Sequence, residues 1–163
     1  MLRLRNVLFL CTGNSARSIM AEAMLNHLGR GRFRAFSAGS HPTGQLNPRA
    51  LATLEAMGIP ARDARSKAWD EFAAMGAPPI DIVITVCDDA AGETCPIWPG
   101  RPAKAYWGVA DPAAAQGSDE KKRAAFEQAA AILRRKIEYL VALPMERLRD
   151  AELRDELEAA GRL

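Results

Sequence analysis

The sequence predicts a doubly wound α/β domain, with about four parallel strands and helices on both faces of the sheet. Two apolar runs rich in strand-forming residues, 6–10 and 80–86, each end directly on a cysteine and a polar loop. Strand-like runs alternate with segments of helical periodicity, the longest at 119–143. This alternation is typical of a parallel sheet covered on both sides.

The first half of the chain contains two strand–helix units. After the first run, apolar side chains recur at three- to four-residue spacing from Ile19 to Leu28, and Gly29 ends that helix. A second strand is expected at 33–37, before turn-forming residues. A second helix is expected at 48–58, because its apolar side chains share one face and it lies between a proline and a glycine.

The second half completes the sheet. A short helix is expected at 69–75, ahead of the strand at 80–86. The segment 88–102 is rich in glycine, proline and acidic residues and is expected to be a long surface loop. A last strand is expected at 103–107, and the long helix at 119–143 would pack its apolar stripe on the sheet.

The domain organisation expected is a single unit with a helical tail. Residues 1–143 are expected to form the α/β domain, and 144–163 a C-terminal helical tail packed on the same domain. The tail alternates charges around Leu148, Leu153 and Leu157, which suits a helix on the domain surface or, alternatively, a dimer seam. We expect a monomer.

Composition excludes several classes of protein. The chain has 163 residues, 48% of them hydrophobic and 26% charged, which fits one globular domain with a core. The net charge of +2, from 22 basic and 20 acidic residues, argues against nucleic acid or an anionic membrane as a partner. The apolar runs are too short for a membrane span or a secretory signal, so we expect a cytoplasmic protein with reduced thiols.

The three cysteines are Cys11, Cys87 and Cys95, and two of them follow the strongest strands. In open α/β sheets, ligands bind beyond the carboxyl ends of the strands. Neighbouring parallel strands lie about 4.8 Å apart. If these two strands are neighbours, Cys11 and Cys87 can approach disulfide distance after a modest loop movement.

The segment from Cys11 to Arg17 has the spacing C-x5-R between a strand and a helix. Five residues allow the backbone to curl so that its N–H groups converge, and the helix N-terminus adds positive potential. Arg17 can donate two hydrogen bonds to one tetrahedral anion. We therefore expect an oxyanion cradle that lowers the pKa of Cys11 and makes it a nucleophile. Its residues are Thr12, Gly13, Asn14, Ser15, Ala16 and Arg17, with Gly13 and Asn14 suited to left-handed backbone.

Asp111 is a candidate general acid. Pro112 stiffens its loop, and a carboxyl group that faces a bound oxyanion retains its proton more readily. The alternative is an ordinary solvated aspartate in a turn.

The motifs VLFLCTGNSARSIMAEAML, Ser37-Ala38-Gly39 and Asp111-Pro112 together resemble the low-molecular-weight protein tyrosine phosphatase superfamily. The form NSARS of the loop, with TVCDDAAGETCPIWPG and YWGVADPA, is similar to the arsenate reductase branch. The resemblance implies that Cys11 is the nucleophile, Arg17 the oxyanion clamp, Ser18 a hydroxyl that supports the thiolate, and Asp111 the acid. Asn14 would be a structural loop residue, and Ser37 part of the shell that holds it.

The same resemblance implies a thiol relay that reduces arsenate to arsenite and so detoxifies arsenic. Cys87 would attack the Cys11 sulfur, and Cys95 would carry the disulfide outward to thioredoxin, or to glutaredoxin and glutathione. Phosphate and sulfate would compete with arsenate. The alternative for Cys87 is a buried apolar thiol, and for Cys95 an incidental surface thiol.

No metal or other cofactor is expected. In the branch of the family with a potassium-supported site, an acidic residue follows a serine or threonine where this chain has Arg65-Ser66-Lys67. Lys67 would replace the charge of the cation.

Two other functions stay open at this point. The first is a protein tyrosine phosphatase that hydrolyses aryl phosphates with the same Cys11, Arg17 and Asp111. The second is a non-catalytic module that binds oxyanions or senses redox state.

Overall fold

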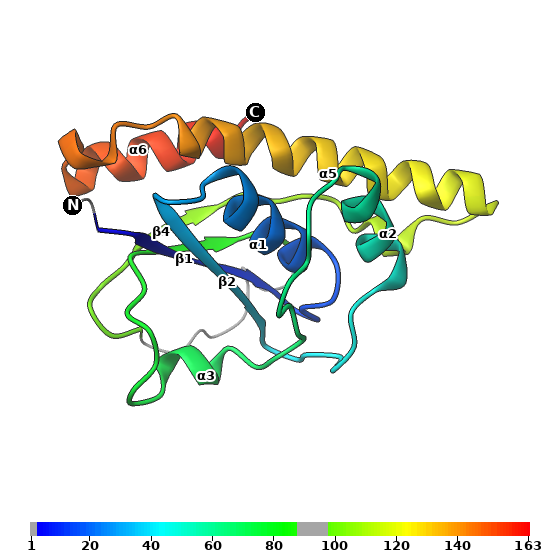
Figure 1. Ribbon diagram of the computed structural model, residues 1–163, viewed down its shortest axis with the longest axis horizontal. Helices are drawn as coiled ribbons and strands as arrows, with labels where there is room; N and C mark the ends of the chain where they lie inside the picture. The colour runs from blue at the N-terminus through cyan, green and yellow to red at the C-terminus, as the bar shows by residue number, and fades with distance from the viewer. Residues whose placement is uncertain (1–2, 88–97) are drawn as a thin grey trace.

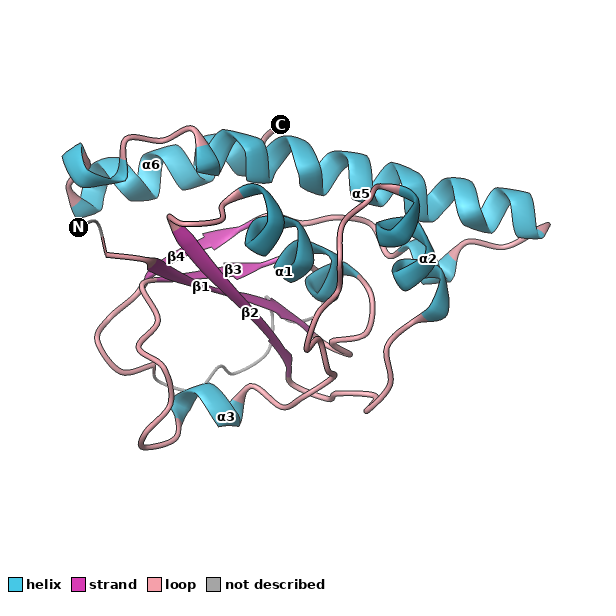
Figure 2. Cartoon of the chain, in the orientation of Figure 1, coloured by secondary structure: helices cyan, strands magenta, loops and turns pink. Residues whose placement is uncertain are grey.

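The sheet of this computed structural model, which describes residues 3–87 and 98–163, has four parallel strands. The strands are β1 (Arg5–Cys11), β2 (Phe33–Gly39), β3 (Ile82–Thr85) and β4 (Ala103–Tyr106), in the order β2-β1-β3-β4 (Figure 2). The predicted α/β class and parallel sheet are confirmed. β1 is central, so the residues that follow it open at the middle of the sheet edge where ligands bind.

β3 is shorter than the predicted strand 80–86. At its N-terminal side the Asn6 amide donates to the Asp81 carboxylate at 2.8 Å instead of to a backbone carbonyl, although the Asp81 N–H still donates to the Asn6 carbonyl at 2.9 Å. The same carboxylate also accepts from the Arg3 guanidinium. Beyond Thr85, the Val86 amide still donates to Leu10 at 2.9 Å. The chain therefore stays beside β1 until Cys87.

Helices cover the two faces of the sheet unequally (Figure 1). One face carries α1 (Arg17–Leu28), α2 (Pro48–Ala56), α5 (Asp119–Val141) and α6 (Asp150–Gly161). The other carries the short α3 (Asp70–Ala73) and its flanking loops. Two 3-10 turns, η1 (Pro112–Ala114) and η2 (Met145–Arg147), precede α5 and α6. None of the helices in the described ranges is long and apolar enough to cross a membrane.

Alternate side chains of β1, β2 and β3 enter two separate cores, as the twofold repeat of a strand requires. Val7, Phe9 and Ile84 face the layer of α1, α5 and α6. Leu8 and Leu10 face the opposite side, where Trp69, Phe72 and Trp98 cover them. Trp107 is buried in the first core, so each core contains a buried tryptophan.

The C-terminal helix α6 is anchored to the rest of the chain. The Trp107 indole donates to the Leu157 carbonyl at 2.9 Å, and the buried Lys136 ammonium donates to the carbonyls of Gly161 and Leu163 at 2.7 and 2.9 Å. Leu153 and Leu157 are buried in the main core. The apolar side of the tail is thus covered within the chain, which leaves no dimer seam of these leucines.

Candidate active site

The loop 12–16 lies between the end of β1 and the start of α1. Cys11 is the last residue of β1 and is buried, and Arg17 is the first residue of α1. The end of β2 passes directly against this loop: a Cβ at Gly39 would lie 2.7 Å from the Cys11 carbonyl oxygen and nearer still to that of Thr12. Only glycine allows this close approach.

The carbonyl groups of the loop point toward the segment 41–47. The His41 N–H donates to the Thr12 carbonyl at 2.9 Å, and the Thr43 N–H donates to the Gly13 carbonyl at 3.0 Å. The Asn47 N–H donates to the Ser15 carbonyl at 2.9 Å. Within residues 3–87 and 98–163, no acceptor takes the N–H groups of Gly13, Asn14 or Ser15. Such a curl of amides forms a nest that can bind an anion.

The N-terminus of α1 is not capped by a side chain. α2 and α5 begin with the capping side chains of Asn47 and Ser118, whereas Ala16 precedes α1 and makes no such bond. The first N–H groups of α1 are therefore available to a ligand, and its dipole adds positive potential at the loop.

Asn14 fixes the shape of the loop from inside. It is fully buried with φ 46°, its amide donates to the Ser18 hydroxyl at 2.8 Å, and its carbonyl oxygen accepts from the Lys67 backbone N–H at 2.9 Å. Gly13, expected to share the left-handed conformation, does not adopt it. In the described part of the chain, Ser18 makes no hydrogen bond to the Cys11 sulfur.

Arg17 and Asp111 face each other across the site. The Arg17 side chain is 11% exposed; it donates to the Val109 carbonyl at 2.8 Å and lies 3.8 Å from the Asp111 carboxylate. That carboxylate is 46% exposed and accepts from the Ala113 N–H at 2.9 Å, which caps η1. The loop around Pro112 thus holds a carboxyl group and a guanidinium over one end of α1.

Cys87 lies beside the loop. β1 and β3 are parallel neighbours, with Leu10 opposite Thr85, which confirms the expected adjacency of the two strands. The Thr12 amide donates to the Cys87 sulfur at 3.2 Å, and Cys87 is fully buried. Cys95, in the segment 88–97, lies outside the described residues.

The pKa of Cys11 is raised, which is opposite to the sequence expectation. The Cys87 thiol, as hydrogen-bond partner, raises it most, and burial raises it further; the charge of Arg17 and the Thr12 amide lower it by less. The expectation considered the helix and Arg17 but not a second thiol in contact. The contact with Cys87 therefore favours the protonated form of Cys11.

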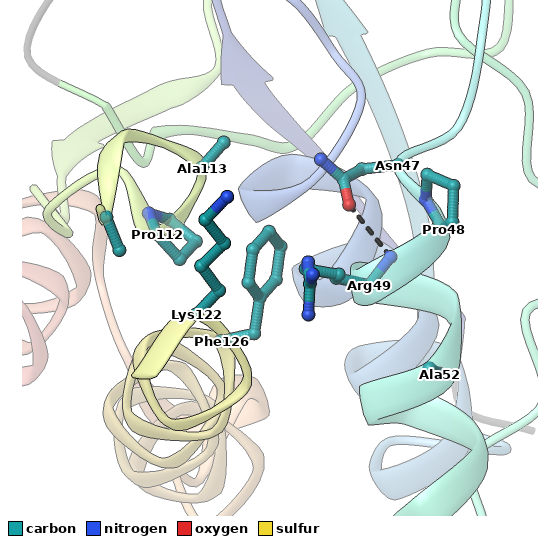
Figure 3. A pocket seen from close by; sticks show the side chains of 9 residues that line it. Asn47, Pro48, Arg49, Ala52, Pro112, Ala113, Lys122 and Phe126 are labelled. Carbon is teal, nitrogen blue, oxygen red and sulfur yellow. Dashed lines mark hydrogen bonds between the residues drawn. The ribbon is translucent and has the colours of Figure 1, made fainter. Parts of the chain in front are cut away.

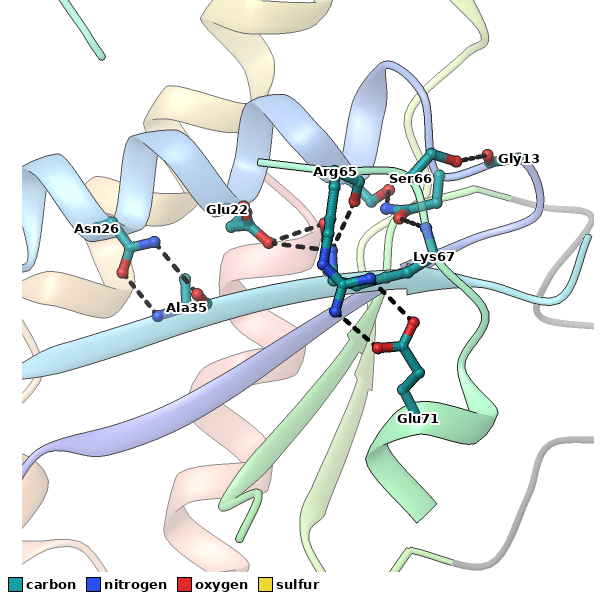
Figure 4. Close-up of polar contacts among 11 residues, drawn as sticks. Gly13, Glu22, Asn26, Ala35, Arg65, Ser66, Lys67 and Glu71 are labelled. Atoms are coloured by element: carbon teal, nitrogen blue, oxygen red, sulfur yellow. Dashed lines mark hydrogen bonds and ion pairs between the residues drawn. The ribbon is translucent and has the colours of Figure 1, made fainter. Parts of the chain in front are cut away.

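A buried polar cluster that the sequence analysis missed lies behind the loop (Figure 4). The Ser37 hydroxyl donates to the Glu22 carboxylate at 2.9 Å, instead of holding Asn14, and the Lys67 ammonium lies 3.8 Å from Glu22. Lys67 also donates to the Arg65 carbonyl at 2.7 Å. A potassium ion does not fit these residues, because the ammonium already lies beside the carboxylate. Glu22 could have been noticed as the one acid within the apolar run of α1.

A cavity of about 450 Å³ opens next to the Asp111 loop, between α2 and the start of α5 (Figure 3). Arg49 and Lys122 line it, and Pro112 forms one wall. Neither Cys11 nor Arg17 lines this cavity, so it lies outside the anion loop.

The family of the chain follows from a family model that matches residues 6–156, described as low molecular weight phosphotyrosine protein phosphatase. The chain belongs to this family. The matched region covers the anion loop, both buried cysteines and Asp111, and extends into α6.

Relatives within the phosphatase family include arsenate reductases. The chain is 38% identical to the arsenate reductase of Bacillus subtilis (strain 168) over 75% of its own length and 84% of that protein. A solved structure of an arsenate reductase in the phosphate binding state is 28% identical, with a TM-score of 0.69 over 85% of this chain and 98% of that one. A thioredoxin-dependent arsenate reductase of Corynebacterium glutamicum is 25% identical, with a TM-score of 0.55 over 83% of this chain and 62% of that one.

Proposed function

We propose that the protein reduces arsenate to arsenite, with Cys11 as nucleophile in an oxyanion loop and Cys87 as the thiol that completes the reduction. The observation that carries the proposal is the position of the Cys87 sulfur, 3.2 Å from the amide of Thr12, the residue that follows Cys11. Hydrolysis of a phosphate ester ends with water and needs no second thiol, whereas reduction of As(V) needs two electrons. The arsenate reductases among the relatives support the same choice.

In the first step, arsenate binds the amides of residues 12–16 and the Arg17 guanidinium, as phosphate or sulfate would in competition. The bound dianion accepts the proton that Cys11 holds in the resting form. The Cys11 thiolate then bonds to As(V), and one arsenate oxygen leaves as water after Asp111 supplies a proton.

In the second step, the Cys87 thiolate attacks the Cys11 sulfur. The S–S bond forms as the S–As bond breaks, and the electron pair of the broken bond stays on arsenic, which leaves as arsenite. The Thr12 amide supports this step, because a hydrogen bond donated to a sulfur favours negative charge on it.

In the third step, Cys95 attacks the Cys87 sulfur, which frees Cys11 as a thiolate and leaves a Cys87–Cys95 disulfide. A dithiol partner of the thioredoxin type then supplies two electrons and restores both thiols. One relative is described as thioredoxin-dependent, which supports this partner over glutaredoxin with glutathione.

The test is a coupled assay with reduced protein. With thioredoxin, thioredoxin reductase and NADPH, we expect NADPH consumption only when arsenate is added, and one arsenite formed per NADPH. A parallel assay replaces thioredoxin with glutaredoxin and glutathione. If neither donor supports arsenite formation by a protein that binds sulfate, the proposed function is wrong.

A further inference from the structure

The ion pair of Glu22 and Lys67 is buried directly behind the anion loop (Figure 4). Glu22 is 7% and Lys67 8% exposed. Charged groups of these types are rarely buried to this extent unless they are paired. The pair joins α1 to the segment 65–67, which also contacts Gly39 of β2 and Glu71 of α3.

That segment is the support of the loop 12–16. The Ser66 hydroxyl donates to the Gly13 carbonyl at 3.2 Å, and the Lys67 backbone N–H donates to the Asn14 side chain at 2.9 Å. The Lys67 carbonyl in turn accepts from Gly39 at 2.9 Å. A shift of 65–67 would therefore move Gly13 and Asn14, two of the loop residues whose amides line the nest.

The side chain of Lys67 fixes this segment in two ways. Its ammonium folds back onto the Arg65 carbonyl at 2.7 Å, and its charge meets the Glu22 carboxylate of α1. If the Lys67 side chain is removed, the Glu22 carboxylate still accepts from the Ser37 hydroxyl but has no buried cation beside it. Removing one partner of a buried pair leaves an uncompensated charge, which is strongly destabilising.

The balance of charge around Glu22 depends on Lys67. Burial raises the pKa of Glu22, and Lys67 is the largest influence that lowers it. Burial likewise lowers the pKa of Lys67, and Glu22 opposes that effect. The charge of Arg65 lowers the pKa of both Glu22 and Lys67. Arg65 lies at the surface, where its guanidinium donates two hydrogen bonds to the Glu71 carboxylate. The other charged groups that line the adjacent cavity are Arg34, Arg62 and Asp63.

We propose that Lys67 is a positioning residue, a built-in cation that holds the loop 12–16 in its anion-binding form by compensating Glu22. The inference rests on the proposed function, since it concerns the same loop, and deepens it. Lys67 then supplies the positive charge beside Glu22 that a bound monovalent cation would supply. It requires that the effect of Lys67 on the anion site be electrostatic and transmitted through Glu22.

The experiment measures sulfate binding, as protection of Cys11 from alkylation by iodoacetamide, read by peptide mass spectrometry at pH 6 and pH 8. The sulfate dissociation constant of each variant is divided by that of wild type at the same pH. We expect Lys67→Met to weaken sulfate binding by about tenfold at pH 8, because Glu22 loses its buried cation. The loss should be smaller at pH 6 than at pH 8, because burial raises the pKa of Glu22 and a lower pH favours its neutral form.

Two further variants separate charge from packing. Glu22→Gln with Lys67→Met removes both charges and should bind sulfate within about threefold of wild type at both pH values. Lys104→Met is the matched control, because it makes the same substitution at an exposed lysine on β4, the edge strand opposite β2; it should bind like wild type. Sulfate binding by Lys67→Met equal to wild type, or a double variant as weak as the single one, would overturn the proposal.

A measurement on wild type keeps the test independent of whether the variants fold. Sulfate affinity should be the same in potassium chloride and in choline chloride, since Lys67 supplies the charge. Affinity that rises with potassium contradicts the proposal. Arsenite formation does not enter any of these measurements, so a wild type that binds sulfate without reducing arsenate refutes the proposed function alone.

Discussion

The amide nitrogen of Thr12 lies 3.2 Å from the sulfur of Cys87. The loop 12–16, which follows Cys11, therefore contacts a second thiol through its first residue, Thr12. The contact exists because β1 and β3 are parallel neighbours that both end at this edge of the sheet. It brings together Cys11, the proposed nucleophile, and Cys87, its proposed disulfide partner. The proposed chemistry depends on this arrangement.

Replacing Cys87 should change the ionisation of Cys11. Because the Cys87 thiol is the largest cause of the raised pKa, Cys87→Ala should lower the pKa of Cys11 and speed its alkylation at pH 7, about tenfold for each pKa unit. Cys87→Ser keeps a polar neighbour and should have a smaller effect. The measurement is the rate of iodoacetamide alkylation against pH. An unchanged profile for Cys87→Ala would show that Cys87 does not hold the Cys11 proton in place.

Arg17→Lys should reduce kcat/KM for arsenate by about a hundredfold, because an ammonium cannot donate the planar pair of hydrogen bonds. The variant also loses the bond to Val109 that orients the side chain. Arg49→Lys is the control: Arg49 lines the neighbouring cavity and forms an exposed pair with Asp119. It should stay within about twofold of wild type, and equal losses in both variants would argue against an oxyanion clamp.

Asp111→Asn should lower kcat by about 10² to 10⁴ while leaving sulfate affinity nearly unchanged. Asparagine can still accept the Ala113 N–H and cap η1, so the fold of the loop should persist. Asp119→Asn, which changes an exposed carboxylate on α5, serves as the control. Full activity of Asp111→Asn would remove Asp111 from the chemistry.

Gly39→Ala should impair the anion loop through backbone contact. The added Cβ would press on the carbonyl oxygens of Cys11 and Thr12, and the loop must shift. We expect weaker sulfate binding together with a lower Tm. Gly76→Ala offers a comparison, because Gly76 has φ +89° in open space. It should lose about 1 kcal/mol of stability and keep its sulfate affinity.

The elements that the sequence predicts well are those that local pattern determines. The run before Cys11 and the spacing to Arg17 predicted a strand, a curled loop and a helix, and β1, the loop and α1 follow that order. The strand 80–86 was predicted too long, because the Asp81 side chain takes the place of a ladder partner. Such a contact joins residues 75 apart in the sequence, and no local pattern encodes it.

The missed features at the site are likewise long-range. Lys67 is one of three polar residues in a surface-like segment, and only the fold places its ammonium beside Glu22 of α1. The pKa of Cys11 was predicted in the wrong direction for the same reason, since the thiol that raises it lies 76 residues away along the chain. Sequence pattern identified the loop, Arg17 and the neighbouring Cys87, but neither the buried Glu22–Lys67 pair nor the effect of Cys87 on the pKa of Cys11.

The most direct test of the thiol relay is a disulfide map after a single turnover. Reduced Cys95→Ser protein is mixed with arsenate without any reductant, quenched in acid and analysed by peptide mass spectrometry, with arsenite quantified alongside. The account predicts a Cys11–Cys87 disulfide and one arsenite per protein, and a Cys87–Cys95 disulfide when wild type is treated in the same way. Arsenite formed while Cys87 remains a free thiol would contradict it.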